Sequence, residues 1–376
     1  MTSSPTPVDM YAPASPAEAS LISIETRPRS RVSADFFLRG LTRLSALTIV
    51  GMLAALLLVL TVAAMPSIRN YGWAFLTSTD WRPNVIERPL RGPDGKLVRD
   101  ADGEVVMETL HESFGALNVI YGTAVSSTLA LVFAVPVSLG AAIFLVRVAS
   151  ARFVGPVSFL IEFLAAIPSI AYGIWGLFVL APFLQSHVEP FLQSWLKDVP
   201  GFSWMFWDAA VVGGKTVYRL HPLTGRDMFC GGMILAIMII PIITAISRDV
   251  LCGVPRAQVE GTTALGATWW QSSKEMLKFS RSGLFGAVML GLARAAGETM
   301  AVAMVIGNNN QIEPSPFAPA QTMSSLLANE FAEANGELHP AALTEVALIL
   351  LVMSLAFNML ARWLVVGKGA RTAAAH

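Results

Sequence analysis

Long apolar runs, separated by shorter polar stretches, dominate the chain from about residue 42 onward. Six of these runs reach the roughly 20 residues that a helix needs to cross the hydrocarbon core of a bilayer. We therefore expect an all-α, polytopic membrane protein with six transmembrane helices. The predicted spans lie near 42–66, 116–147, 155–184, 229–252, 283–308 and 341–366.

The two ends of the chain lack such runs. Residues 1–41 are rich in Ser, Pro and Ala, which predicts a disordered tail. The transmembrane domain is expected to occupy 42–367, followed by a short C-terminal tail at 368–376. The leader before the first span is too long for a cleaved signal peptide, so that span is expected to stay as a membrane helix.

Three prolines fall inside predicted spans: Pro136, Pro168 and Pro241. Neighbouring helices can satisfy the backbone groups that a proline frees inside a membrane. We therefore predict that each proline marks a kink within a helix and not a helix end.

Composition supports membrane residence and excludes several function classes. Hydrophobic residues make up 54% of the chain and charged residues 14%, whereas soluble domains carry about 25% charged residues. The net charge is zero, so nothing suggests nucleic acid as a partner, and lipid is the expected surroundings. Cys230 and Cys252 lie at opposite ends of one span, roughly 33 Å apart, too far to form a disulfide. The five histidines lack ligand spacing, so neither a metal nor a cofactor is expected.

Basic residues are concentrated on one side of the predicted membrane. The loop at 309–340, on the other side, has no basic residue and carries Glu313, Glu330, Glu333 and Glu337. Short cytoplasmic loops are enriched in Lys and Arg, so both termini are predicted to be cytoplasmic. The residues behind this prediction are Arg27, Arg29, Arg31, Arg39, Arg43, Arg147, Arg152, Arg248, Arg256, Lys274, Lys278, Arg281, Arg362, Lys368 and Arg371.

Two segments on the external side are longer than simple connections. Residues 82–112 contain the turn-forming stretches GPDG and Asp-Gly between apolar pairs, which predicts a β-hairpin. Residues 185–228 mix apolar and polar positions with three tryptophans, as in an interfacial helical excursion. Each segment is either a lineage-specific loop insertion without a function of its own or a docking surface for an external partner.

Of 26 Lys and Arg residues, only Arg294 falls in the middle of a predicted span. Glu298 follows four positions later, so in a continuous helix both side chains would point from one face. A charge at bilayer depth costs at least ~2.5–3.5 kcal/mol, which an ion pair partly offsets. Two interpretations stay open: an ion pair that locks the helix bundle, or a ligand site. Small residues that allow close helix approach, or leave room for a ligand, surround the pair: Gly291, Ala293, Ala295, Ala296 and Gly297.

The chemistry of the pair favours an oxyanion if it is a ligand site. The planar guanidinium of Arg294 matches two oxygens of a phosphate. Glu298 can only accept hydrogen bonds when ionised, so it favours an oxyanion that still carries a proton, such as hydrogen phosphate. Sulfate would meet an unpaired repulsion there. Two further acids lie near span interiors: Glu162, expected to face the bundle, and Glu345, expected to be interfacial.

The cytoplasmic loop at 253–282 is compatible with helices on either side of Gly266 and holds no catalytic constellation. Either it docks a soluble partner or it is a linker helix lying on the surface. The stretch AAVVGGKT at 209–216 is not a phosphate-binding loop, because Ala209 replaces the first glycine. We therefore do not expect the chain to hydrolyse nucleotide or to be an enzyme.

Several stretches identify a family resemblance. EGTTALGATWW (260–270) resembles the EAA loop of ABC-importer permeases, and GLARAAGETMAVAMVIGN (291–308) resembles the signature of the PstC family of phosphate-importer permeases. The resemblance covers most of residues 40–367. Further matching stretches are FGALNVIYGTAVSS (114–127), EFLAAIPSIAYGIWGLFVLAP (162–182) and LLANEFAEANGELH (326–339).

The resemblance implies a fold similar to the MetI-like permease core and a role in ATP-driven phosphate import. Arg294, Glu298 and Thr299 become the expected substrate-binding residues. The implied partners are a PstA-type second permease, two PstB-type ATPase subunits and an external PstS-type phosphate-binding protein. The residues expected to couple to the ATPase are Glu260, Gly261, Ala264, Leu265 and Gly266.

The loop departs from the EAA pattern at two places: Gly261-Thr262 follow Glu260 where alanines are usual, and Lys278 stands where a proline is usual. Alternatives in function are a permease for sulfate or molybdate and a membrane receptor or scaffold. An intramembrane enzyme would need a nucleophile–base set or a metal cluster, and the sequence offers neither.

Overall fold

The structure, a computed structural model, describes residues 32–84, 86–89, 105, 107–110, 112–212, 215–220 and 222–373. Residues 1–31 of the tail predicted at 1–41 and residues 374–376 of the tail predicted at 368–376 lie outside these residues, and residues 368–373 belong to the last helix, which ends at Ala373. The chain is helical from Val32 onward, in α1 (Val32–Tyr71), so the prediction of a tail is wrong for residues 32–41. The chain divides into two units, Met1–Leu58 and Val59–His376.

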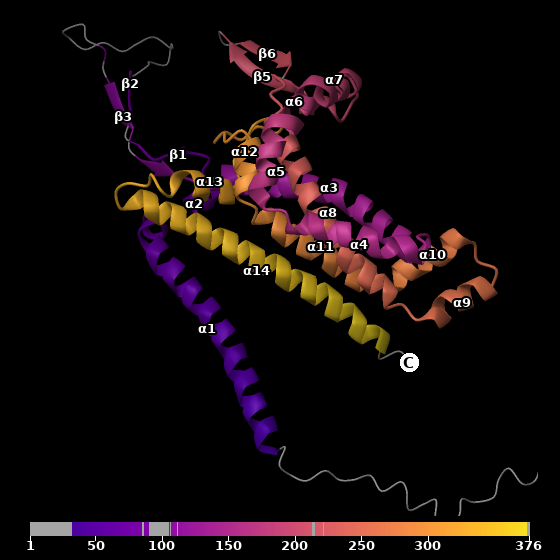
Figure 1. Ribbon diagram of the computed structural model, residues 1–376. Helices are drawn as coiled ribbons and strands as arrows, with labels where there is room; N and C mark the ends of the chain where they lie inside the picture. The colour runs from indigo at the N-terminus through magenta and orange to yellow at the C-terminus, as the bar shows by residue number, and fades with distance from the viewer. Residues whose placement is uncertain are drawn as a thin grey trace, which may run out of the picture. The chain divides into compact units, whose positions relative to one another are not determined.

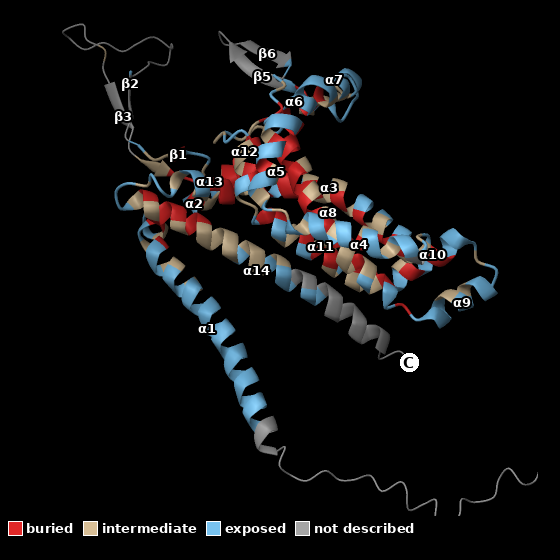
Figure 2. Cartoon of the chain, viewed as in Figure 1, coloured by how far each residue is buried: buried red, intermediate tan, exposed pale blue. Residues whose placement is uncertain are grey.

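In the described part of the chain, five helical stretches are long and apolar enough to cross a membrane. Four of the six predicted spans are confirmed, and the third is shifted toward the C-terminus. In the first unit the apolar side chains of α1 are almost all exposed (Figure 2), as expected for a helix that lipid surrounds. The five stretches are Phe36–Tyr71, Leu117–Arg147, Ser169–Leu196, Met228–Cys252 and Leu338–Met359.

The predicted span at 155–184 is divided at Pro168. Helix α4 (Ala151–Ala166) ends before it, and α5 (Ser169–Trp175) begins directly after it. Ile167 is extended, with φ −65° and ψ 130°, because a residue before proline is disfavoured in the helical region. The helical path continues through η4 (Gly176–Leu180), α6 (Ala181–Phe183), η5 (Leu184–Val188) and α7 (Glu189–Leu196).

The other two prolines do not end their helices, as predicted. Pro136 lies inside α3 (Leu117–Arg147) and Pro241 inside α8 (Met228–Cys252), and both helices continue through them. Cys230 lies in the first turn of α8 and Cys252 is its last residue, and both cysteines are free, as the sequence predicted.

The predicted span at 283–308 is not one helix. It consists of α11 (Arg281–Ala296) and the short α12 (Met300–Val305), and residues 297–299 between them are not helical. Glycine lowers helix stability by about 1 kcal/mol relative to alanine, which favours an interruption at Gly297. The fifth predicted span is therefore divided into two helices, which is consistent with the expected six-span fold although it is not a single long helix.

Within the described part of the second unit there are three two-stranded antiparallel sheets. Strands β1 (Trp81–Arg82) and β4 (Ser113–Phe114) pair with each other, as do β2 (Ile86–Pro89) and β3 (Met107–Leu110). The hairpin predicted for 82–112 is therefore confirmed, although its GPDG and Asp-Gly turns lie outside the described residues.

The segment 185–228 is only partly the helical excursion that the sequence predicted. Helix α7 and the single turn η6 (Ser203–Met205) are helical, but β5 (Trp207–Val212) and β6 (Lys215–Leu220) form an antiparallel hairpin. The strands carry valines, Tyr218 and Thr216, residues that favour extended structure, on either side of Gly213-Gly214. That signal predicts a hairpin better than the three tryptophans predict a helix.

Helix α8 is the centre of the second unit. It is the most buried of the five spans, and α3 and α11 pack against it around Leu235, Ile239 and Ile243 (Figure 2). At Gly122 on α3 the backbone of Gln321 comes so close that any Cβ would overlap its carbonyl oxygen. Small residues thus let helices and loops approach this core closely.

The two ends of α8 carry different structures. At the Met228 end, the backbone N–H groups of Met228 and Phe229 donate to residues 318 and 316, just before α13 (Met323–Glu330). At the Cys252 end lie α9 (Arg256–Ala264) and α10 (Trp269–Phe279), on the opposite side of the unit in Figure 1. The last helix, α14 (Leu338–Ala373), starts near α2 (Ala74–Thr77) and α13.

Candidate functional site

Arg294 lies in the last turn of α11 with an exposed side chain. The opposite face of the helix is packed: a Cβ at Gly291 would lie 2.7 Å from Ile243 Cδ1 of α8, and Ala295 is buried in the same core. The small residues therefore hold α11 close to α8 and turn Arg294 away from that contact. Among the described residues its guanidinium has no ion-pair partner.

Glu298 does not share a helix face with Arg294, and this prediction is wrong. The helix stops at Ala296, so Glu298 belongs to the non-helical turn before α12. No ion pair joins the two side chains in the described structure. The interpretation of an intrahelical pair that locks the bundle therefore has no support.

The backbone of Glu298 is held from a distant part of the chain. Ser324 Oγ donates a 2.6 Å hydrogen bond to the carbonyl oxygen of Glu298. Ser324 is itself fixed at the start of α13, where the N–H of Met323 donates to Thr123 Oγ1 of α3 at 3.0 Å. Thr299 lies beside Glu298, and its hydroxyl donates to the carbonyl oxygen of Gly297 at 3.4 Å.

Sequence reasoning missed Ser324 as a partner of this turn and Thr123 as a partner of the start of α13. A local signal existed, because Thr322 and Ser325 form a capping box with the side-chain and backbone groups of each other. Ser or Thr at such spacing marks a helix start. The long-range contact of that helix with Glu298 has no signature in the sequence.

The two other acids exchange the environments that we predicted for them. Glu162 on α4 is exposed instead of facing the bundle, and its Oε1 lies 3.9 Å from Arg248 Nη2 of α8. Glu345 on α14 is buried instead of interfacial, and its Oε2 has no hydrogen-bond partner in the described part of the chain. Glu162 lies on the side of α4 that meets α8 near its Cys252 end, where water or a partner can reach a carboxylate.

The loop between α8 and α11 has the form that the sequence predicted: two helices, α9 and α10, on either side of Gly266. Gly266 has φ +81°, a left-handed conformation that glycine adopts without strain. Thr268 and Gln271 form a capping box at the start of α10. These local features fix the sharp change of direction between the helices.

One face of this loop is attached to the bundle and the other is free in this chain. Thr262 Oγ1 donates to Ser272 Oγ at 3.1 Å, and Arg147 Nη2 at the end of α3 lies 3.5 Å from the same oxygen. Leu265 is 90% exposed, as an apolar side chain that awaits a partner would be. The five residues expected to couple to an ATPase are all exposed: Glu260, Gly261, Ala264, Leu265 and Gly266.

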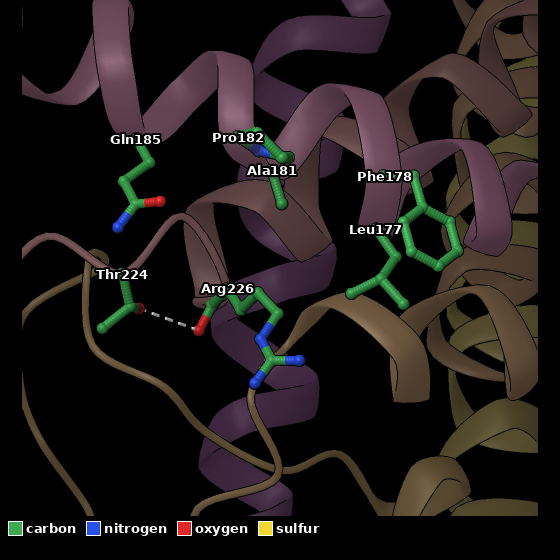
Figure 3. Close-up of a pocket in the computed structure, with 7 residues that line it drawn as sticks. All are labelled: Leu177, Phe178, Ala181, Pro182, Gln185, Thr224 and Arg226. Atoms are coloured by element: carbon green, nitrogen blue, oxygen red, sulfur yellow. Dashed lines mark hydrogen bonds between the residues drawn. The ribbon is translucent and has the colours of Figure 1, made fainter.

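A pocket of about 320 Å³ lies at the Met228 end of α8 (Figure 3). Leu177, Phe178, Ala181 and Pro182 line its apolar side, and Arg226 reaches in from the segment before α8. Two further lining residues are already engaged. Gln185 Nε2 donates to the carbonyl oxygen of Leu223 at 3.2 Å, and Thr224 Oγ1 donates to that of Arg226 at 3.2 Å.

Comparison with known proteins identifies the family. Residues 134–367 match the model of the "binding-protein-dependent transport system inner membrane component" family. A phosphate transport system permease protein PstC from Mesorhizobium japonicum is 37% identical over 341 residues, which are 90% of this chain and 92% of that protein. The protein of the same name from Pasteurella multocida is 38% identical over 332 residues, covering 88% and 91%.

A solved structure of the MetNI methionine ABC transporter is also similar, with 16% identity, a TM-score of 0.45, and coverage of 67% of this chain and 94% of that one. The relatives are named as permeases of ABC transport systems, and this agrees with the expectation that the chain is not an enzyme. The family match, the relatives and the helical fold together show that this chain belongs to the binding-protein-dependent transport system inner membrane components and, within them, to the PstC permeases of ABC transporters.

Proposed function

We propose that the chain is the permease subunit through which an ATP-driven importer passes inorganic phosphate across the cytoplasmic membrane. The main structural support is Arg294: a guanidinium in an apolar helix, exposed, without an ion-pair partner among the described residues, and next to a helix interruption. A charge placed at membrane depth costs free energy, so a ligand that uses it is the simplest reason for its presence. The relatives' names supply the anion, phosphate.

Arg294 contributes the positive charge and a planar pair of N–H donors for two phosphate oxygens. Glu298 contributes an acceptor, which suits hydrogen phosphate because its P–OH group can donate to a carboxylate. Since Glu298 lies in the turn and not on α11, the two groups approach an anion from a helix end and from the turn after it. The hydroxyl of Thr299 is the third polar group at this place.

ATP hydrolysis by separate subunits reaches this site through the loop of α9 and α10. Its support is geometric: the loop is fastened to α3 by Thr262, Ser272 and Arg147, while Leu265 is exposed on the free side. Two ATPase subunits, a PstA-type second permease and an external phosphate-binding protein complete the proposed importer. With both termini cytoplasmic, the hairpins β2–β3 and β5–β6 lie on the external side.

Uptake of labelled phosphate tests the proposal. We expect Arg294→Ala to abolish uptake and Arg294→Lys to restore only part of it, because lysine lacks the planar fork. Arg152→Ala on the exposed surface of α4 is the matched control and is expected to transport normally. Membrane insertion is measured for each variant by its amount in purified membranes. Normal uptake by a normally inserted Arg294→Ala variant would refute the role of Arg294.

Selectivity tests Glu298 separately. Glu298→Gln removes the charge that repels sulfate while keeping the size of the side chain. We expect this variant to discriminate less between phosphate and sulfate, measured as competition of sulfate with phosphate uptake. Unchanged discrimination would assign selectivity to other residues, and stronger uptake of sulfate than of phosphate by the wild-type chain would favour the alternative of a sulfate permease.

A further inference from the structure

Two carboxyl groups are buried together at the Met228 end of α8. Glu189 is the first residue of α7, and Asp227 is the residue directly before α8; both are 0% exposed. The two side chains lie within hydrogen-bonding contact of each other. Neither residue belongs to the transport site around Arg294 nor to the loop at the other end of α8.

This pair has more acceptors than donors. Asp227 Oδ1 accepts the N–H of Cys230 at 2.8 Å and so caps α8. The three remaining oxygens, Asp227 Oδ2 and both oxygens of Glu189, accept no well-formed hydrogen bond from the described residues. The backbone of Gly225 lies close to Glu189, and that of Phe229 lies close to Asp227, but the N–H of Phe229 already donates to the carbonyl oxygen of Pro316 at 2.8 Å. Buried acceptors without donors are costly, and two adjacent buried carboxylates also repel each other.

No nearby cation relieves that repulsion within the described structure. Arg226 is the adjacent residue, but its side chain is exposed and lies in the pocket of Figure 3, whereas Asp227 is buried on an extended backbone (φ −151°, ψ −178°). His187 of η5 is exposed as well. The titratable group that faces the pair from α8 is the buried thiol of Cys230, which is no counter-charge.

We propose that Glu189 and Asp227 form a proton-binding site that holds one proton between the two carboxyl groups. Asp227 carries the proton on Oδ2 and donates it to the ionised carboxylate of Glu189, while its Oδ1 still caps α8. One proton thus turns an acceptor into a donor and leaves a single negative charge. The pair behaves as a dyad that shares its titration.

A divalent cation fits this place less well. Ca²⁺ takes six to eight oxygen ligands and Mg²⁺ six, usually with several waters, and two fully buried carboxyl groups supply at most four oxygens. In the described part of the chain there is also no group of three or more His, Cys, Asp or Glu residues that could hold a metal. A proton needs only two adjacent carboxyl groups, which Glu189 and Asp227 supply.

The position of the pair indicates which part of the structure the proton stabilises. Glu189 and Asp227 stand at the two ends of the segment that carries η6 and the β5–β6 hairpin. Just before Asp227, Gly225 has φ +67°, and a Cβ there would overlap the carbonyl oxygen of Ala181. The proton therefore holds the two ends of the segment 189–227 together next to a tightly packed backbone. Loss of the proton weakens this contact between the two ends.

Infrared difference spectroscopy on the full chain in its purified complex tests the proposal without any transport assay. We expect a band of a protonated carboxyl group at neutral pH that disappears on alkaline titration. Asp227→Asn and Glu189→Gln should each remove it, whereas Asp198→Asn, which changes an exposed acid of the same excursion, should keep it. Glu345 is a second buried acid, so the difference between wild type and variant assigns the band.

Isotope labelling keeps the test decisive if a variant fails to fold. In wild-type protein, ¹³C-labelled aspartate should shift the band, because the proposed proton is on Asp227. A neutral-pH spectrum without a protonated band, or a band that persists in both variants, would overturn the proposal. The proposal would also be overturned if the band is absent and a chelator lowers the unfolding temperature, because the pair would then bind a metal ion. Failure of phosphate uptake in Arg294 variants leaves these outcomes unchanged.

Discussion

The indole N–H of Trp81 donates a 2.7 Å hydrogen bond to Oε2 of Glu330, which lies 249 positions away in the chain. The same oxygen lies 3.2 Å from His339 Nε2, and Phe114 stacks on the His339 ring with centroids 5.4 Å apart. Strands β1 and β4 thereby contact the last residue of α13 and the start of α14. A charged acceptor inside an aromatic cluster makes this a strong long-range connection.

Trp81→Phe removes the donor while an aromatic ring still fills the site. Because a hydrogen bond to a charged group contributes about 1.5–3 kcal/mol, we expect the variant to lose stability of that order. Thermal unfolding of the purified protein measures it. Trp204→Phe is the control: the indole of Trp204 donates to the carbonyl oxygen of Gly201 at 2.9 Å, but its ring is largely exposed. Equal losses in the two variants would contradict the importance of the buried connection.

The proposed coupling loop depends on the backbone of Gly266. With φ +81°, a side chain at this position strains the backbone by about 1–2 kcal/mol, although there is open space around it. We therefore expect Gly266→Ala to change the path between α9 and α10 and to lower the phosphate-dependent ATPase activity of the assembled importer. Gly155→Ala, also in open space but without a positive φ, should leave that activity unchanged.

The sequence predicted elements with strong local signals and failed where tertiary contacts decide. Apolar runs located α3 and α8 closely, and Gly266 correctly divided α9 from α10. The break at Gly297 was missed because an apolar run does not distinguish one helix from two. Pro168 ended a helix while Pro136 and Pro241 did not, a difference that the residue type alone cannot reveal.

The residues proposed for the candidate site were chosen from the sequence, but their geometry was not predictable from it. Arg294 stands out by charge in an apolar span, and small neighbours such as Gly291 do mark a close helix contact. The position of Glu298 depends on Ser324, a residue 26 positions away whose contact no spacing rule contains. Glu189 and Asp227 escaped notice for the same reason, since 38 positions separate them and neither lies in a recognisable motif.

The stability of the wild-type protein should depend on pH through Asp227. Burial, and then the nearby Glu189, raise the pKa of Asp227 well above its usual range. The folded protein therefore keeps a proton that the unfolded chain releases near pH 4. The contribution of Asp227 to the free energy of unfolding is fully present below about pH 4. It is lost as the pH rises through the pKa of Asp227 in the folded state. The Asp227→Asn variant can still cap α8 but has no carboxyl group to titrate, so its unfolding temperature should depend less on pH than that of the wild type. Equal pH dependence of the unfolding temperature in the two proteins would contradict this prediction.

Ser324 is expected to act as a positioning residue for Glu298. Its hydroxyl is buried and donates to the Glu298 carbonyl oxygen, so Ser324→Ala leaves that oxygen without this donor and frees the turn before α12. Removal of such a hydrogen bond costs about 0.5–1.5 kcal/mol. Because the Glu298 carboxylate is then held less firmly, we expect the KM for phosphate to rise severalfold and the discrimination against sulfate to weaken. Ser324→Thr keeps the hydroxyl and should restore both, whereas Thr128→Ala, which removes an exposed hydroxyl bonded within α3, should change neither. A Ser324→Ala variant that loses thermal stability but keeps its KM and its selectivity would show that the contact is only structural.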